Sequence, residues 1–179
     1  MSSDSVFLTG VVDAKEGRDV AVLDIANAFL HADNDEEILM LLRGKLAEMM
    51  VQVDPTMYHK YVTYSAKGQA MLYVKLTKAL YGMLRAALLL YKRLRGDPEN
   101  MGFEVNPYDP CVANKMVNGK QMTICWHVDD LKVSHVDKNA VTALALELAK
   151  LYGPKTKMLE EKYTTIWACN WTGDPRRVR

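Results

Sequence analysis

The dipeptide Asn118-Gly119 constrains the fold of this chain more than any other feature of its sequence. It is flanked by two apolar stretches, Val112 to Val117 and Lys120 to Val128. Because Asn-Gly readily adopts the positive φ angles of a tight hairpin turn, the pattern predicts two antiparallel strands. Leu131 to His135 predicts a third strand, which follows directly after Asp129-Asp130. The sequence therefore predicts a three-stranded antiparallel meander with two adjacent carboxylates at one of its hairpin tips.

The remaining segments mix helices and strands without a regular βαβ repeat. Val20 to Ile25 has the pattern of a short buried strand. Lys138 to Tyr152 predicts a helix, with Asp137 as its N-cap and Gly153 as its stop. Other expected elements are a helix from Phe7 to near Gly17, a helical turn at Asn27–His31, helical spacing in the second half of Ile38–Met50, a hairpin of Tyr58–Tyr64 with Gln69–Leu76, and a long Ala- and Leu-rich helix at Lys78–Arg95. This mixture predicts an α+β fold.

Length and composition fit one globular domain. The chain has 179 residues, of which 49% are hydrophobic and 25% charged. The longest apolar stretch, Ala86 to Tyr91, is too short to span a bilayer, and the N-terminus lacks the pattern of a secretory signal. Cys111, Cys125 and Cys169 show no metal-ligand spacing, so we expect reduced thiols that are mostly buried. We expect an intracellular protein with no membrane partner.

Basic residues are segregated in the middle of the chain, although the net charge is only +1. Between Pro55 and Gly96 there is no acidic residue, and there are eight basic ones: Lys60, Lys67, Lys75, Lys78, Arg85, Lys92, Arg93 and Arg95. Such a run forms either a positive face for a polyanion or an ordinary solvated face. The charge pattern alone does not decide between these two interpretations.

Asp129-Asp130 and Asp24 are the candidate metal ligands. Adjacent carboxylates at the end of apolar strands repel one another and resist desolvation, and a cation relieves both costs. Asp24 ends a strand that reads as buried, where a carboxylate is costly unless it is paired or metal-bound. Together the three carboxylates suit two Mg²⁺ ions held roughly 3.5–4 Å apart. A solvated turn at Asp129-Asp130 is an equally open interpretation at this point.

Three ordered motifs resemble the copia-type retrotransposon reverse transcriptases. Val22-Leu-Asp-Ile-Ala-Asn-Ala-Phe-Leu-His31 resembles the first catalytic motif of that family, and Leu80-Tyr-Gly-Met83 resembles its Leu-Tyr-Gly motif. Gly102-Phe103, Tyr108-Asp-Pro-Cys-Val112 and His127-Val-Asp-Asp130 are similar to the run into its Tyr-x-Asp-Asp box. The resemblance covers residues 5–153. It implies a palm-like antiparallel sheet packed on helices, with incomplete fingers and no thumb.

The resemblance also implies a role for each matching residue in RNA-directed DNA synthesis. Asp24, Asp129 and Asp130 would hold two Mg²⁺ ions, with Mn²⁺ as an alternative, and the Ile25 carbonyl oxygen would be an extra ligand. Phe29 would lie under the incoming deoxyribose and clash with a 2′-hydroxyl; without the family it reads as a core aromatic. Tyr81 and Gly82 would border the nucleotide pocket, although helix packing explains Tyr81 equally well.

The partners that the resemblance implies are an RNA template, a DNA primer, dNTPs and the rest of a retrotransposon polyprotein, in a cytoplasmic particle or the nucleus. The basic run would meet the template–primer backbone.

The sequence departs from the family in three respects. His127 stands where the family usually has tyrosine, and Ala26 and Arg85-Ala-Ala87 also deviate. After Gly153 the resemblance stops, so residues 154–179 are expected to be a frameshifted or disordered tail. Permitted codons for Glu161–Gly173, read two bases later, spell KIHDYLGMQLDW, which is similar to the family's downstream Tyr-Leu-Gly-Met segment. An inactive retroelement fragment that at most binds nucleic acid, or another two-metal palm enzyme, is the alternative.

Overall fold

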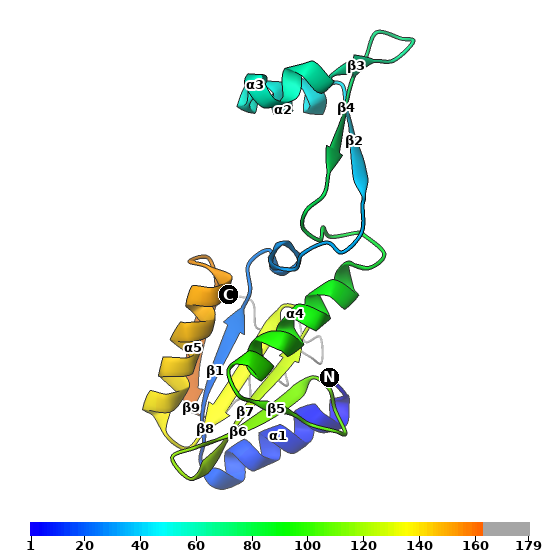
Figure 1. Cartoon of the computed structure of the whole chain (residues 1–179). Helices are drawn as coiled ribbons and strands as arrows, with labels where there is room; N and C mark the ends of the chain where they lie inside the picture. Colours follow the sequence, from blue (N-terminus) through cyan, green and yellow to red (C-terminus); the bar gives the residue numbers. More distant parts are fainter. Residues whose placement is uncertain (163–179) are drawn as a thin grey trace, which may run out of the picture.

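A computed structural model describes residues 1–162 of the chain (Figure 1). Its main body is a sheet of six strands in the order β5-β6-β7-β8-β1-β9, with every neighbouring pair antiparallel. The strands are β1 Asp19–Asp24, β5 Glu104–Val105, β6 Val112–Val117, β7 Lys120–His127, β8 Asp130–His135 and β9 Lys157–Lys162. Antiparallel sheets packed on helices confirm the predicted α+β class.

The β6–β7–β8 meander forms as the sequence predicts. Asn118 and Gly119 have φ angles of 50° and 75°, and they join Val117 to Lys120 at the end of the ladder. Both residues therefore take the left-handed conformation that the tight hairpin requires. The local turn chemistry sets this register without help from distant parts of the chain.

Two helices, α4 Ala86–Asn100 and α5 Lys138–Tyr152, cover one face of the sheet (Figure 1). The core between them and the strands contains Leu94, Leu148 and Trp126, each at most 1% exposed. α5 has the predicted bounds, because the Asp137 side chain accepts a hydrogen bond from the Asn139 N–H at 2.9 Å and the helix stops at Gly153. The helical spacing of its apolar residues is confirmed by their burial.

The helix α1, Ser3–Glu16, covers part of the opposite face of the sheet. Under it lies a buried charged cluster of Asp13, Arg18 and Lys132, each 2% exposed. Lys132 pairs with Asp13, and Arg18 donates to the Thr123 hydroxyl at 3.1 Å. Because both faces are covered, β8 is buried at almost every position, with charged and polar residues facing α1 and apolar residues facing α5.

Cys125 also lies under α1, where it packs with Val6 and Val112. Burial raises the pKa of its thiol to about 12, so the group stays protonated. Cys111 is partly buried and Cys169 lies outside the described residues. The expected burial is confirmed for Cys125 and holds in part for Cys111.

A smaller unit projects from the main body and is reached by two chain segments (Figure 1). It contains a sheet of order β2-β4-β3, made of β2 Leu39–Arg43, β3 Thr63–Tyr64 and β4 Ala70–Lys75. The helices α2 Lys45–Val53 and α3 Pro55–Tyr58 and the short 3-10 helix η2 His59–Tyr61 pack beside it. A further 3-10 helix, η1 Ala28–His31, follows β1, as the helical turn predicted there.

The predicted hairpin of Tyr58–Tyr64 with Gln69–Leu76 is wrong in part, whereas the helical spacing in the second half of Ile38–Met50 is confirmed by α2. The main partner of β4 is β2, paired over five positions, whereas β3 pairs with it over only two. Helical structure occupies most of the expected first strand of the Tyr58–Tyr64 hairpin. The first half of Ile38–Met50 is a strand, because β4 offers it a complete ladder, and Gly44, at φ 54°, separates it from α2.

The long helix α4 begins at Ala86, eight residues later than predicted. The segment before it is held in extended form, because the Ala79 N–H donates to the Ala32 carbonyl at 2.9 Å. Leu80–Met83 then forms a turn in which Gly82 has a φ of 91°. The Leu-Tyr-Gly segment therefore precedes the helix and is not part of it.

The strand β9 pairs with β1 along the whole length of β1. The described part of the segment expected to be a frameshifted or disordered tail, residues 154–179, therefore includes a strand. Residues 163–179, including most of the segment with the alternative reading frame, lie outside the described residues. Within residues 1–162, no helix is long and apolar enough to cross a membrane.

Candidate metal centre

The three candidate carboxylates come from two adjacent strand ends of the main sheet. Asp24 is the last residue of β1 and Asp130 the first of β8, and the two are directly opposite each other in the ladder. Asp129 lies in the two-residue turn between β7 and β8. The structure therefore brings the backbones of all three residues to one corner of the sheet, although Asp24 is more than 100 positions from the other two in sequence.

The turn that carries Asp129 is fixed to the end of β1. The Ile25 N–H donates a hydrogen bond to the Asp129 carbonyl at 3.0 Å, so this ladder extends one step past Asp24 and Asp130. The other turn residue, Val128, has a φ of 54° and is 48% exposed. A β-branched residue in this region is strained, and such strain persists only where the surroundings hold it in place.

The carboxylates differ in their exposure to solvent. Leu23 and Ile25 on either side of Asp24 are buried, but Asp24 itself is exposed. The expectation that Asp24 ends a buried strand therefore holds for its neighbours and fails for its own side chain, because the strand ends at the surface. Asp129 is exposed and Asp130 is half-buried.

The pKa of Asp130 is raised to about 6, mainly by burial and in addition by the neighbouring charges of Asp129 and Asp24. This shift shows that the three acidic groups interact across the corner of the sheet. A cation between the three carboxylates would offset both the desolvation of Asp130 and the repulsion by its neighbours. Carboxylate oxygens are the ligands that Mg²⁺ prefers, so the chemistry of the donor set fits the predicted ion.

The side chains do not converge on one point in this conformation. Within residues 1–162, no group of three or more His, Cys, Asp and Glu side chains is arranged closely enough to hold a metal ion. Because Asp24 and Asp129 are exposed, rotation of their side chains meets little resistance from packing. The backbone arrangement thus fits a shared ion, and the side chains would have to turn toward it.

Phe29 and Tyr81, predicted to border a nucleotide, are in contact. Phe29 lies on η1 and Tyr81 in the turn before α4, with ring centroids 5.8 Å apart and an edge-to-face angle of 66°. Phe29 is also packed against the core, whereas Tyr81 is 89% exposed. The structure therefore supports the interpretation of Phe29 as a core aromatic, and its role beside a nucleotide stays a prediction.

Gly82 is exposed, and a Cβ atom built on it would meet no heavy atom within 4 Å. Gly82 therefore lies open at the surface and does not pack closely against another part of the described chain. Its φ of 91° explains why glycine is present, because side chains with a Cβ rarely adopt this conformation.

The acidic loop at Asp33–Glu37 neutralises much of the basic run, a relation that the sequence analysis missed. Arg85 pairs with Asp35 at 3.0 Å and also with Glu36, and Lys78 pairs with Asp33 at 2.5 Å. Lys75 and Lys92 pair with the same loop, while Arg93 and Arg95 pair within α4. The opposite charges of the two segments could have indicated this pairing from the sequence. The two segments meet because both lie at the neck of the smaller unit.

His127 is half-buried and stands opposite Asp130 in the β7–β8 ladder. Burial lowers the pKa of its imidazole, and the N-terminal amino group lowers it further, against the raising effect of Asp129. The ring is therefore mostly neutral near pH 7.

A sheet corner with three interacting carboxylates, on an α+β fold of antiparallel sheets and helices, defines a candidate centre for divalent cations. The chain is similar to the retrovirus-related Pol polyprotein from transposon TNT 1-94 of Nicotiana tabacum, with 26% identity over 138 residues. That match covers 76% of this chain and 9% of the Pol polyprotein, so the chain spans a small part of its relative. No family model matches the sequence.

Among solved structures, the chain is similar to telomerase from Candida tropicalis in complex with a fragment of telomeric RNA. The TM-score is 0.45 at 11% identity, over 90% of this chain and 30% of the telomerase chain. The sequence match, by contrast, relates the chain to a retroelement polyprotein.

Proposed function

We propose that this chain is the palm-like part of a copia-type retrotransposon reverse transcriptase, which adds dNTPs to a primer 3′-hydroxyl on an RNA template. The observation that carries the proposal is the register of Asp24 against Asp130, with the Asp129 turn bound to Ile25. Similarity to a retrotransposon Pol polyprotein supports it. The native setting would be a cytoplasmic particle or the nucleus, within a larger polyprotein.

In this proposal Asp24, Asp129, Asp130 and the Ile25 carbonyl would hold two Mg²⁺ ions. When bound, the ions would activate the primer hydroxyl and stabilise the leaving phosphate oxygens. The corner of the sheet brings the carboxylates together without burying them all, so substrate phosphates have access. Metal binding would require Asp130 in its ionised form. We therefore expect binding of Mg²⁺ to weaken as the pH falls through about 6.

Phe29 would select the sugar of the nucleotide in this scheme. Its ring is held from behind by the core and from the side by Tyr81, so it cannot easily move to admit a 2′-hydroxyl. Gly82 would let the nucleotide or template approach the backbone, since its surface is open. The sequence feature that weighs against full activity is His127 in the place of the family's tyrosine.

The second candidate is a fragment that has lost catalysis and at most binds nucleic acid. Two observations favour it: the carboxylate side chains do not converge, and four basic side chains are engaged by the acidic loop. Both features reduce affinity for metal and for phosphate.

Primer extension on an RNA template with dNTPs and Mg²⁺ separates the two candidates. The wild-type chain is expected to extend the primer, and the Asp129→Asn, Asp130→Asn double variant is not. Asp19→Asn, at the opposite end of β1, is the matched control and should retain extension. Extension by the wild type no greater than by the double variant would refute the enzymatic proposal.

Metal binding has an independent readout. Millimolar Mg²⁺ at pH 8 should raise the free energy of unfolding of the wild type and leave that of the double variant unchanged, because a ligand stabilises only the state that binds it. Mg²⁺-dependent stability without extension would identify a surviving centre in an inactive fragment.

A further inference from the structure

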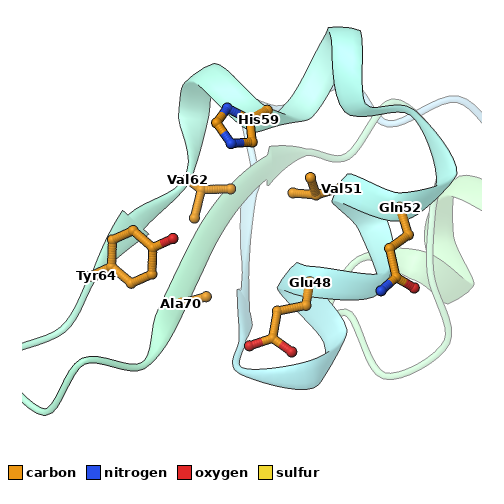
Figure 2. Close-up of a pocket in the computed structure, with 7 residues that line it drawn as sticks. All are labelled: Glu48, Val51, Gln52, His59, Val62, Tyr64 and Ala70. Atoms are coloured by element: carbon orange, nitrogen blue, oxygen red, sulfur yellow. The ribbon is translucent and has the colours of Figure 1, made fainter.

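The smaller unit contains a hollow of about 340 Å³, remote in sequence from the carboxylate centre (Figure 2). It opens between α2, η2 and the β3–β4 hairpin. Its base is apolar, formed by Val51, Val62 and the buried Ala70. A hollow of this size with an apolar base suits a small planar group rather than a protein segment.

The rim of the hollow combines aromatic rings with polar groups. Figure 2 shows the Tyr64 ring at one edge with its hydroxyl turned toward the centre, and the His59 ring above the opening. Glu48 and Gln52 come from α2, where their spacing of four residues places them on the same side of the helix. The hollow therefore offers rings for stacking beside one carboxylate and one amide.

The smaller unit that contains the hollow carries an excess of positive charge, and part of this charge is not neutralised as it is at the neck. Lys45, Lys60 and Lys67 lie on the same small unit and are exposed. Among residues 1–162, none of the three is within ion-pair distance of a carboxylate, whereas Lys78 and Arg85 are. Across residues 39–75 there are five basic and two acidic residues. The unit thus attracts a polyanion, while Glu48 repels a phosphate from the hollow itself.

We infer that this hollow binds one unpaired nucleobase of a single-stranded nucleic acid, with the flanking phosphates lying over the lysines. The apolar base and the Tyr64 ring would contact the face of the nucleobase, as aromatic side chains do in single-strand binding. Glu48 would accept hydrogen bonds from its edge. This inference requires neither the metal centre nor catalysis, so it does not depend on the proposed function.

The carboxylate makes the site selective among bases. Guanine presents two adjacent N–H donors on its Watson–Crick edge, which match both oxygens of Glu48. Cytosine and adenine each present one amino group, and thymine and uracil present a single ring N–H beside carbonyl oxygens that a carboxylate repels. The expected order of affinity is guanine, then cytosine and adenine, then thymine and uracil.

Fluorescence anisotropy of two labelled oligonucleotides tests the site in the full chain, without Mg²⁺. One is a short oligothymidine strand, and the other is the same strand with a single central guanine. The wild type should bind the guanine strand about tenfold more tightly. Tyr64→Ala should weaken binding of that strand about tenfold, and Tyr64→Phe should retain most of the affinity.

Tyr73→Ala is the matched control, since Tyr73 is an exposed tyrosine on β4 that does not line the hollow. Glu48→Gln should abolish the preference for guanine without weakening the oligothymidine strand, because it removes the paired acceptor and not the ring. Circular dichroism of each variant checks that the fold is retained.

Equal affinity for the two strands, equal effects of Tyr64→Ala and Tyr73→Ala, or no binding of either strand would each overturn the inference. Guanine-dependent binding in a chain that fails to extend primers would refute the proposed polymerase and leave this site standing. Primer extension by a chain that shows no preference for the guanine strand would refute this site and leave the proposed polymerase standing.

Discussion

Replacing Asp130 by asparagine tests whether the acidic groups at the sheet corner destabilise the folded chain in the absence of metal. The pKa of Asp130 is raised from 3.8 to about 6, by burial first and then by the charges of Asp129 and Asp24. The folded protein therefore binds this proton more tightly than the unfolded chain does. The contribution of this bound proton to the stability of the folded state is fully present below about pH 4 and is lost as the pH rises through about 6.

The size of the effect follows from the two pKa values. In full, the difference corresponds to about 3 kcal/mol at pH 8, at 1.36 kcal/mol for each factor of ten in proton affinity. Asp130 is only half-buried, so solvent screening reduces the expected effect to about 1–2 kcal/mol. Asparagine occupies the same volume and carries no charge, so Asp130→Asn should be more stable than the wild type by this amount at pH 8.

Urea denaturation in metal-free buffer, followed by tryptophan fluorescence, measures the difference at pH 4 and at pH 8. The gain in free energy of unfolding from Asp130→Asn should be present at pH 8 and close to zero at pH 4. Asp24→Asn removes one of the two neighbouring charges and should give a smaller gain. A gain that is the same at both pH values, or a loss at pH 8, would show that the carboxylates do not interact as described.

Three further predictions concern stability and are measured by urea denaturation. Val128→Gly should stabilise the chain by about 1 kcal/mol, because it removes a β-branched residue from a φ of 54°; a destabilised variant would contradict strain in this turn. Lys132→Met should cost about 3–5 kcal/mol because it removes the nearer of the two cations that pair with buried Asp13 and leaves only Arg18, at 3.9 Å; adding Asp13→Leu should restore most of the loss, and failure of this second change to rescue would refute the pairing. Leu148→Ala, at the fully buried centre of α5, should cost about 2–5 kcal/mol, and a cost below 1 kcal/mol would place α5 outside the core.

Local signals account for the parts of the fold that the sequence predicts correctly. Asn118-Gly119 defines the β6–β7 turn through its own backbone preferences. Asp137 and Gly153 define both ends of α5. These residues need no information from the rest of the chain, so inspection of a short window is sufficient.

Elements whose conformation depends on a distant partner are predicted less well. The strand in the first half of Ile38–Met50 was not predicted, because β2 forms only where the distant strand β4 completes its hydrogen bonds. Lys78–Arg85 has helix-forming composition, yet the bond from Ala79 to Ala32 keeps its start extended, and a turn at Leu80–Met83 follows. In the second case a tertiary hydrogen bond outweighs a local propensity that is worth only tenths of a kcal/mol per residue.

The candidate site likewise has features that the sequence predicts and features that depend on distant parts of the chain. The sequence predicted that Asp24 and Asp129-Asp130 lie at strand ends and belong to one site, but it did not predict the direct pairing of Asp24 with Asp130. The side-chain directions, and the engagement of Arg85 by the acidic loop, depend on three-dimensional placement that no motif encodes.

The position of β9 at the edge of the main sheet determines which changes in the sequence or length of residues 157–162 the chain can tolerate. An outer strand is held through main-chain hydrogen bonds, and any residue except proline supplies them. Lys157–Lys162 follows β1 along its whole length, so it covers main-chain groups of the strand that carries Asp24. A chain shortened before Lys157 would leave that side of β1 open to pairing with another molecule. Main-chain pairing would let an altered sequence shield β1, provided that it contains no proline and keeps an apolar residue at Met158, which packs against the core.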